Sequence, residues 1–379
     1  MRRGRLQRSF VAIQLAIATI LVVAAGLLVR SLTTLMGEAR GFRTDHVVTV
    51  TTFAWRDFPK PEQRARFVEQ AIDRLEEIPG VMTAAAGSSL PLAERIGPEL
   101  GRFTIPGIPV PADQAPSAQS TIVSPGYFES LGMPIRQGRT FSRDDAASAR
   151  PVVIINERLA RQYWPDQSPI GRSMLVRFAG PPVTREVVGI VADAKRTLAQ
   201  EPPAALYIPH AQNPTGDLNF IVHTSQEPAA VVPLIKSAIQ SVAPVTGLGS
   251  ITTLDTLLDG TLSAPRFILM MVGFFAAAAL LVGAIGTYGV IAYSTAERTK
   301  EIGIRLALGG GRRDVILAIM SDGLRIASIG VVAGLLLAAS VSRLIADLLY
   351  GITPVDWPAY AAADLRHRAG GAGLDLQRR

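Results

Sequence analysis

Glu297-Arg298-Thr299-Lys300-Glu301-Ile302-Gly303-Ile304-Arg305-Leu306-Ala307-Leu308-Gly309 is a charged segment between two long apolar runs of this 379-residue chain. Those runs cover residues 267–296 and 326–342, and another covers residues 9–29; none of the three contains a charged side chain. A helix needs about 20 apolar residues to cross a bilayer. The pattern predicts an integral membrane protein with three transmembrane helices, the third extended over residues 324–345. The quoted segment is then a short loop on one membrane face.

The distribution of charge predicts the orientation of these helices. Residues 1–30 carry five arginines and no acid, whereas residues 31–266 carry 22 basic and 23 acidic side chains. Basic residues collect on the cytoplasmic side of a membrane. We therefore expect a cytoplasmic N-terminus, an extracytoplasmic segment 31–264 and a cytoplasmic loop 297–314. The net charge of +7 comes from this bias, and with no domain-sized basic face we expect no nucleic-acid partner.

A cleaved signal peptide is the alternative for residues 1–29. The apolar run continues through Leu27-Leu28-Val29, beyond the 7–15 residues typical of a signal sequence, which favours an uncleaved anchor. The chain has no cysteine, so the external segment folds without disulfides.

The external segment has the pattern of a mixed α and β domain. We expect strands at residues 47–53, 81–86, 151–155, 186–191 and 220–223, and helices at 61–78, 157–163 and 228–242. Asn156 is the expected N-cap of the helix at 157–163. Alternating strands and helices suggest βαβ units, and the Pro- and Gly-rich stretch 97–118 is typical of a loop or β-arm.

The sequence offers no enzyme chemistry. The four histidines, His46, His210, His223 and His367, are not at metal-ligand spacing, and we expect them exposed or at strand ends. The pair Asp144-Asp145 is typical of a solvated turn. Gly309-Gly310-Gly311 is not a phosphate-binding loop. We therefore expect no catalytic residues, no metal and no cofactor.

Small residues in the apolar runs predict helix packing. Gly330 and Gly334 form a G-x-x-x-G pattern in the third helix, and Gly283 and Gly286 keep one side of the second helix thin. Small residues at such spacings let membrane helices approach closely. The second run would form about 45 Å of helix, longer than the hydrocarbon core, and so tilts or rises above the membrane as a stalk.

The loop resembles the cytoplasmic loop of MacB/FtsX-type ABC transporter permeases, which commonly reads R-T-x-E-I-G-I-R-x-A-L-G-A. Further stretches resemble the MacB-like periplasmic core domain of these proteins. They are Val123-Ser124-Pro125-Gly126-Tyr127-Phe128, Gly138-Arg139-Thr140-Phe141, Val153-Ile154-Ile155-Asn156-Glu157 and Val188-Gly189-Ile190-Val191. Leu349-Tyr350-Gly351-Ile352-Thr353-Pro354 is similar to the external turn after the third helix.

The resemblance implies a permease of the bacterial inner membrane that partners an ABC ATPase and a second permease copy or half, surrounded by lipid. ATP hydrolysis in the ATPase would move the extracytoplasmic domain through the long second helix. The residues that would contact the ATPase match the family's coupling element: Glu297, Arg298, Thr299, Glu301, Ile302, Gly303, Arg305, Ala307, Leu308 and Gly309.

The resemblance also gives domain bounds. Residues 1–30 form the first membrane helix, 31–264 the core domain, 265–347 the second and third helices with the loop at 297–314, and 348–379 an atypical tail. The family's fourth helix is expected after Pro358, where this sequence instead turns Arg- and Gly-rich. The chain thus resembles the second half of a duplicated permease, truncated before that helix. A membrane-anchored extracytoplasmic sensor or scaffold without transport, and a non-functional remnant, are the alternatives.

Overall fold

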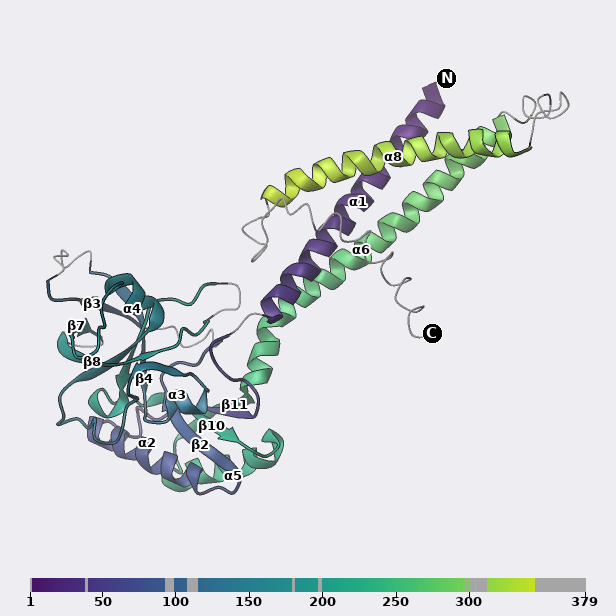
Figure 1. Ribbon diagram of the computed structural model, residues 1–379. Helices are drawn as coiled ribbons and strands as arrows, with labels where there is room; N and C mark the ends of the chain where they lie inside the picture. Colours follow the sequence, from purple (N-terminus) through teal and green to yellow (C-terminus); the bar gives the residue numbers. More distant parts are fainter. Residues whose placement is uncertain are drawn as a thin grey trace, which may run out of the picture. The chain divides into compact units, whose positions relative to one another are not determined.

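A computed structural model shows how these segments fold, and it describes residues 2–37, 40–92, 99–107, 115–178, 181–196, 200–297, 299, 304 and 312–344. The chain divides into two compact units: residues 1–38 with 263–379, here called the helical unit, and residues 39–262, here called the core domain (Figure 1). Helix α6 begins in the core domain and ends in the helical unit.

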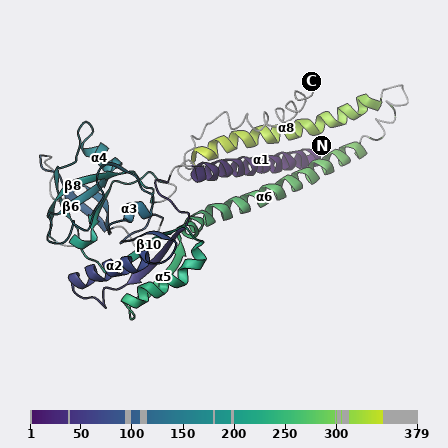
Figure 2. The same ribbon diagram turned by 60° about the horizontal axis from the view of Figure 1, so that its bottom comes forward.

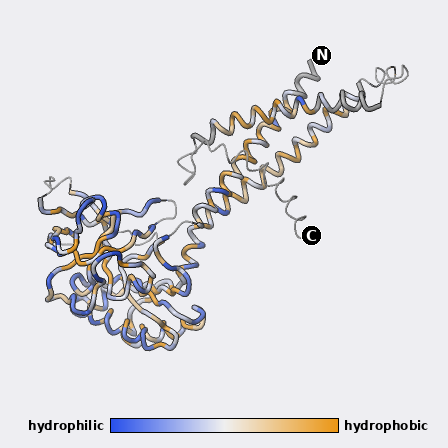
Figure 3. Tube along the Cα trace, in the orientation of Figure 1, coloured by the Kyte–Doolittle hydropathy of each residue, from blue (hydrophilic) through white to orange (hydrophobic). Residues whose placement is uncertain are grey.

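In the part of the helical unit that the structure describes there are three long helices. They are α1 (Arg2–Gly37), α6 (Leu254–Glu297) and α8 (Arg312–Leu344). Segments long and apolar enough to cross a membrane occur among the described residues in α1, at Ser9–Thr34, and in α6, at Leu254–Tyr293. The apolar part of α8, Ala327–Ser340, is shorter. The predicted number of three spans therefore stays a prediction, while the apolar character of α1 and α6 is visible along both helices (Figure 3).

Large apolar side chains on the outer faces of these helices are exposed in the isolated chain. Examples are Phe10 and Ile13 of α1, Phe274 and Ile285 of α6, and Leu336 of α8. Exposed apolar surface on this scale is what a helix facing lipid tails presents, because no water is there to penalise it.

The core domain contains one eleven-stranded sheet, whose first part is four antiparallel strands in the order β11-β1-β10-β2. This part continues into the second set of strands through the pairing of Gly87 with Val123. Its elements are β1 (Val47–Phe53), α2 (Pro61–Glu76), β2 (Val81–Gly87), β10 (Asp217–Thr224), α5 (Pro228–Val242) and β11 (Gly247–Thr253). Helix α2 connects β1 to β2, and helix α5 connects β10 to β11. In each case the two connected strands run parallel with one strand between them, which is the split βαβ arrangement of ferredoxin-like folds. Both helices pack on one face of the sheet (Figure 2).

The chain between β2 and β10 forms a second set of strands. These are β3 (Glu99–Thr104), β4 (Ser117–Val123), β5 (Ile135–Gly138), β6 (Val152–Asn156), β7 (Ser173–Arg177), β8 (Val183–Val191) and β9 (Ala205–Pro209). The pairs β4–β3, β3–β7, β7–β8, β8–β6, β6–β9 and β9–β4 close a ring, so six strands form a small barrel. Closure removes the exposed strand edges that an open sheet would leave.

Short helices complete this inserted barrel. Helix α4 (Glu157–Tyr163) follows β6, and Asn156 caps it as expected, since its side chain accepts a hydrogen bond from Leu159 N at 3.1 Å. Helix α3 (Tyr127–Ser130) follows β4, and a short 3-10 helix, η2 (His210–Gln212), follows β9.

Strand alternation divides the domain into three cores. Leu218, Phe220 and Val222 of β10 face α2 and α5, whereas Ile221 faces α3 and the barrel. Val153 and Ile155 of β6 face the barrel interior in the same way. Successive strand side chains point to opposite faces, so one strand serves two cores. The core around α3 therefore joins the ferredoxin-like sheet to the barrel.

Candidate functional sites in the helices and the core domain

Helices α1 and α8 meet at the two glycines of the G-x-x-x-G pattern. A Cβ placed on Gly330 would lie 2.7 Å from Ala12 O, and one on Gly334 would lie 2.7 Å from Ala16 O. Both distances are shorter than any that carbon and oxygen tolerate without a bond. Backbone therefore lies directly on backbone along this seam, and only a residue without a side chain fits.

Helices α1 and α6 meet through side chains. A Cβ on Gly283 would lie 3.2 Å from Leu15 Cδ2, and one on Gly286 would lie 2.8 Å from Gln14 Oε1. Gln14 Oε1 is buried and has no hydrogen-bond partner. The glycines here make room for the ends of longer side chains, so this seam is looser than the one with α8.

The contacts also fix the directions of the helices. Along the α1–α8 seam the numbers rise together, from Gly330 opposite Ala12 to Gly334 opposite Ala16, so the two helices are parallel. Along the α1–α6 seam they change in opposite senses, from Gly283 opposite Leu15 to Gly286 opposite Val11, so these helices are antiparallel. Helix α1 lies between the other two (Figure 2).

The coupling loop is described only in part. Glu297 is the last residue of α6, and the hydroxyl of Thr299 donates to Thr295 O at 3.1 Å and Ala296 O at 2.9 Å. Ile304 is exposed. The other residues assigned to the loop lie outside the described residues: Arg298, Glu301, Ile302, Gly303, Arg305, Ala307, Leu308 and Gly309.

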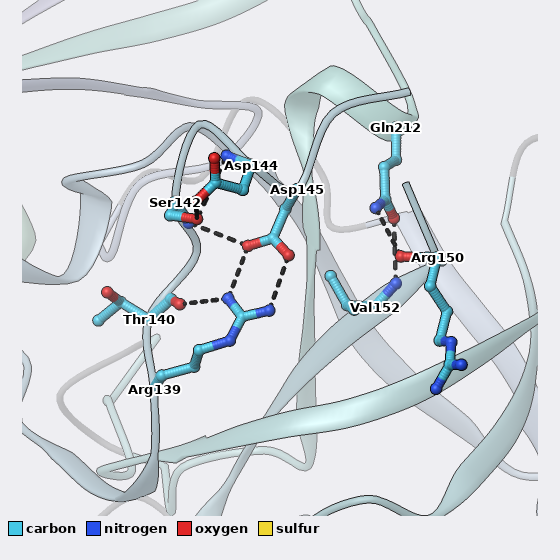
Figure 4. A network of polar contacts seen from close by, with 8 residues as sticks. All are labelled: Arg139, Thr140, Ser142, Asp144, Asp145, Arg150, Val152 and Gln212. Atoms are coloured by element: carbon cyan, nitrogen blue, oxygen red, sulfur yellow. Dashed lines mark hydrogen bonds and ion pairs between the residues drawn. The ribbon is translucent and has the colours of Figure 1, made fainter. Parts of the chain in front are cut away.

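In the core domain a charged loop after β5 is held in one conformation (Figure 4). Arg139 donates to both carboxylate oxygens of Asp145, at 2.7 and 2.8 Å, and Ser142 N donates to Asp145 Oδ2 at 2.9 Å. Gly138 precedes this arginine with φ +75°, and a Cβ there would lie against Val188 O. Only glycine allows the chain to turn here, which explains the Gly138-Arg139 pair.

Asp145 is 4% exposed, so the expectation of a solvated pair is wrong for this residue. Burial opposes its ionisation, but the hydrogen bonds from Arg139 and Ser142 outweigh burial, and the pKa of Asp145 lies below its ordinary value. Asp144 is exposed, as expected.

A second polar cluster lies beside this loop (Figure 4). Gln212 Oε1 accepts from Val152 N at 3.1 Å and from Arg185 Nη1 at 2.9 Å, and its amide nitrogen donates to Arg150 O at 3.1 Å. Arg185 is 5% exposed, and burial lowers its pKa to about 10. Gln212 thus ties the segment before β6 to η2 and satisfies a buried guanidinium.

His210, at the start of η2, directly follows the last residue of β9, so the expectation of a histidine at a strand end is confirmed, and its side chain is buried, at 3% exposure. Its Nε2 lies 2.9 Å from Thr215 O and so donates to that carbonyl. Burial lowers its pKa to about 4, so the ring is neutral near pH 7. Among the described residues, no group of three or more His, Asp or Glu side chains converges as a metal ion would require.

Comparison with known sequences assigns the family. The MacB-like periplasmic core domain matches residues 11–242, more than half of the chain, and the FtsX-like permease C-terminal domain matches residues 273–362. The chain therefore belongs to the MacB/FtsX-type ABC transporter permeases. Its apolar helices accompany a domain of the periplasmic type, and the chain is a permease component of an ABC transporter.

Individual relatives are distant. The chain is 25% identical over 226 residues to the macrolide export ATP-binding/permease protein MacB of Marinobacter nauticus, which covers 57% of this chain and 34% of that protein. It is 23% identical over 306 residues to the uncharacterized ABC transporter permease YknZ of Bacillus subtilis, covering 79% of this chain and 72% of that protein. The chain spans about a third of the length of the MacB relative.

Solved structures of the same kind also match. The periplasmic region of MacB from Actinobacillus actinomycetemcomitans aligns with a TM-score of 0.40 and 17% identity, over 60% of this chain and 97% of that one. The extracellular domain of YknZ from Gram-positive bacteria aligns with a TM-score of 0.32 and 20% identity, over 52% and 91%. The family assignment rests on the two family models and not on these alignments.

Proposed function

We propose that this chain is the permease subunit of an ABC-type export or mechanotransmission system of the bacterial inner membrane. ATP would be hydrolysed by a partner ATPase, and the chain would convert that cycle into movement of its extracytoplasmic core domain. The observation that carries the proposal is the order of the two family matches, core domain at 11–242 and permease domain at 273–362, with helix α6 beginning after the first match and continuing into the second.

The proposed coupling path starts at the loop after α6. The ATPase would contact residues 297–309, and α6 would carry the displacement because one helix, with Pro265 inside it, connects Glu297 to Leu254 after β11. Its 44 residues form about 66 Å of helix at 1.5 Å per residue, twice the thickness of a bilayer core. The MacB relatives are named ATP-binding/permease proteins, so in them both functions belong to one protein, and this supports an ATPase as the partner of this chain.

The proposed assembly needs more helices than the three described here. A second permease copy or half would complete the bundle, with α8 as a third span and lipid around the outer faces. The glycines at 283, 286, 330 and 334 are the proposed packing positions. Segment 348–379, where the fourth helix of the family is expected, lies outside the described residues.

Loop substitutions test the proposal. The chain is purified from native membranes together with any ATPase that accompanies it, and ATP hydrolysis is measured in lipid nanodiscs. Glu301→Ala and Arg305→Ala are expected to lower the recovered ATPase and its stimulated activity at least tenfold. Glu62→Ala, on the exposed side of α2, is the control and should change neither. Unchanged hydrolysis in both loop variants would contradict the docking role, and recovery of the intact chain without an ATPase would favour the sensor alternative.

A further inference from the structure

The segment that leads from α1 into β1 is attached to the rest of the core domain by contacts with residues far away in sequence. Residues 40–46 are here called the entry segment. Arg43 N donates a hydrogen bond to Leu131 O at 2.6 Å, and Lys195 N donates to Arg40 O at 3.0 Å. These backbone contacts join the entry segment to the end of α3 and to the chain after β8.

One side-chain contact of the entry segment depends on a proton. Arg43 Nη1 lies 3.2 Å from Nδ1 and 2.9 Å from Nε2 of His223, near the end of β10. A guanidinium has only donors, so a hydrogen bond to the ring requires an imidazole nitrogen that carries no proton. The neutral ring has one such nitrogen and the imidazolium has none. The hydrogen bond therefore exists only while His223 is neutral.

The surroundings of His223 favour the neutral ring. Burial lowers its pKa below the ordinary 6.5, the charges of Arg43 and His46 lower it further, and only Asp45 acts in the opposite direction. The residues opposite His223 in the sheet are uncharged: Val47 of β1 and Thr83 of β2. From α3, the hydroxyl of Ser130 donates to that of Thr83 and brings no charge.

Arg43 has no carboxylate partner among the residues that the structure describes. Two carboxylates in the pocket beside it are already paired with other arginines, as Arg136–Glu157 and Arg161–Asp193. Protonation of His223 would remove the acceptor and place two positive charges in contact at the same time. The side-chain contact would then oppose the attachment of the entry segment that it supports when the ring is neutral.

We propose that Arg43 and His223 form a pH switch, which holds the entry segment on β10 at neutral pH and releases it when the ring is protonated. The pKa of His223 is lowered while the segment is attached, so the attachment is complete above the ordinary value of 6.5 and weakens as the pH falls from there. The entry segment is the covalent connection from α1 to β1, so its release lengthens that connection. The switch goes beyond the proposed function, since it requires no ATPase and can be measured without one.

A single thiol beside Arg43 tests the release. Thr44 is 3% exposed and the chain has no cysteine, so Thr44→Cys reports when the entry segment detaches. The rate of its modification by a methanethiosulfonate reagent is measured on the full chain in nanodiscs from about pH 7.5 to about pH 5, the range in which such a histidine changes charge. Ser148→Cys, at an exposed position, corrects for the pH dependence of the reagent. We expect the corrected rate to rise below about pH 6.5, by up to about tenfold for each unit of pH. A corrected rate that does not change with pH would overturn the proposal.

Three variants, each combined with Thr44→Cys, identify the group that responds. His223→Gln keeps an acceptor for Arg43 without a titrating proton, so the rate should stay low at every pH. His223→Lys carries a permanent positive charge, so the rate should be high at every pH. His46→Asn is the matched control, since asparagine tolerates the left-handed backbone at this position (φ +58°), and it should keep the response to pH.

Tryptophan emission at each pH confirms that each variant is folded and separates release of the entry segment from unfolding of the core domain in acid. If His223→Lys does not fold, the comparison of His223→Gln with the unsubstituted His223 decides alone. An unchanged response to pH in His223→Gln, or a response that disappears in His46→Asn, would show that another group is titrating and would overturn the proposal.

Discussion

Different interactions stabilise the interior of the helical unit and the interior of the core domain. In the helical unit, α1 contacts α8 through glycines at which the backbones of the two helices lie against each other. The core domain has three apolar cores, and it also buries polar groups that have hydrogen-bond partners, such as Asp145, Arg185 and His210. Lipid tails are as apolar as the helices, so only close fit can hold helices together there, whereas water drives burial in the core domain.

This difference predicts that a larger side chain in the α1–α8 seam destabilises the helical unit, whereas a fall in pH destabilises the core domain. Because the chain has three tryptophans, of which Trp55 and Trp164 lie in the core domain, tryptophan emission follows that domain once Trp357 is replaced by Phe. The helical unit is followed by the fraction of protein that stays monodisperse after heating in detergent.

Gly334→Leu gives the largest expected effect. A side chain at Gly334 meets Ala16 O at 2.7 Å and Thr19 Cβ at 2.7 Å, and a backbone carbonyl cannot rotate away. Overpacking a close-fitted interior costs about 1–3 kcal/mol, and we expect the upper end or more, seen as loss of monodisperse protein at lower temperature. Gly273→Leu in α6, where nothing lies within 4 Å, is the control. Equal losses for the two variants would show that the seam is not close-packed.

Acid is expected to weaken the core domain through His210. Its pKa of about 4 when folded lies below the ordinary 6.5, so the unfolded chain binds a proton more readily between these values. The stability present above pH 6.5 is therefore lost as the pH falls toward 4, by roughly 3 kcal/mol. Thermal melts followed by tryptophan emission should show this loss, and His210→Phe should reduce it. Parallel pH curves for the two proteins would contradict the assignment.

Asp145→Asn should destabilise the core domain by about 1.5–3 kcal/mol at pH 7, because it removes charge-assisted hydrogen bonds from Arg139. The folded pKa of Asp145 is lowered, so its contribution is present above its unfolded value of about 3.9 and is lost as the pH falls below it. The wild type and the variant should therefore converge in acid. Asp144→Asn, on an exposed neighbour, is the matched control, and an equal effect of both substitutions would contradict the role of the Arg139 pair.

Much of the fold follows from local sequence patterns. Helix α2, helix α4 with its Asn156 cap, and helix α5 were predicted from amphipathic spacing and capping residues, and these predictions are confirmed. The expected βαβ character holds for the split units of the sheet. The closed barrel was not predicted, because β3, β7 and β9 are short and their pairing joins residues far apart in sequence, such as Arg102 with Arg177.

The polar residues were predicted less well than the apolar ones. Asp145 and His210 have the composition of solvated loop residues, and only the tertiary structure buries them. The sequence does contain one indication that Asp145 is paired. Arg139 lies only six residues before it, so a short loop can bring the two side chains together. The glycines of the third helix were predicted to pack, but the sequence could not identify α1 as their neighbour. The coupling loop stays a prediction, since most of it lies outside the described residues.

Gly286→Ala gives the smallest expected effect and separates the two seams of α1. The new methyl group meets Gln14 Oε1 at 2.8 Å, but that atom is the end of a flexible side chain and can move aside. Alanine also favours a helix over glycine by about 1 kcal/mol, so the net change in stability should lie within about 1 kcal/mol of zero. Gly334→Ala, which meets a carbonyl instead, should be clearly destabilising.

A double-mutant cycle with Gln14→Ala tests the reason for this small effect. If Gln14 is the obstacle, shortening it should make Gly286→Ala neutral or stabilising, while Gly334→Ala should be unchanged by the same substitution. The readout is again the monodisperse fraction after heating. A Gly286→Ala variant as unstable as Gly334→Ala, with no rescue by Gln14→Ala, would mean that α6 also packs on α1 backbone to backbone, and the distinction between a tight and a loose seam would be wrong.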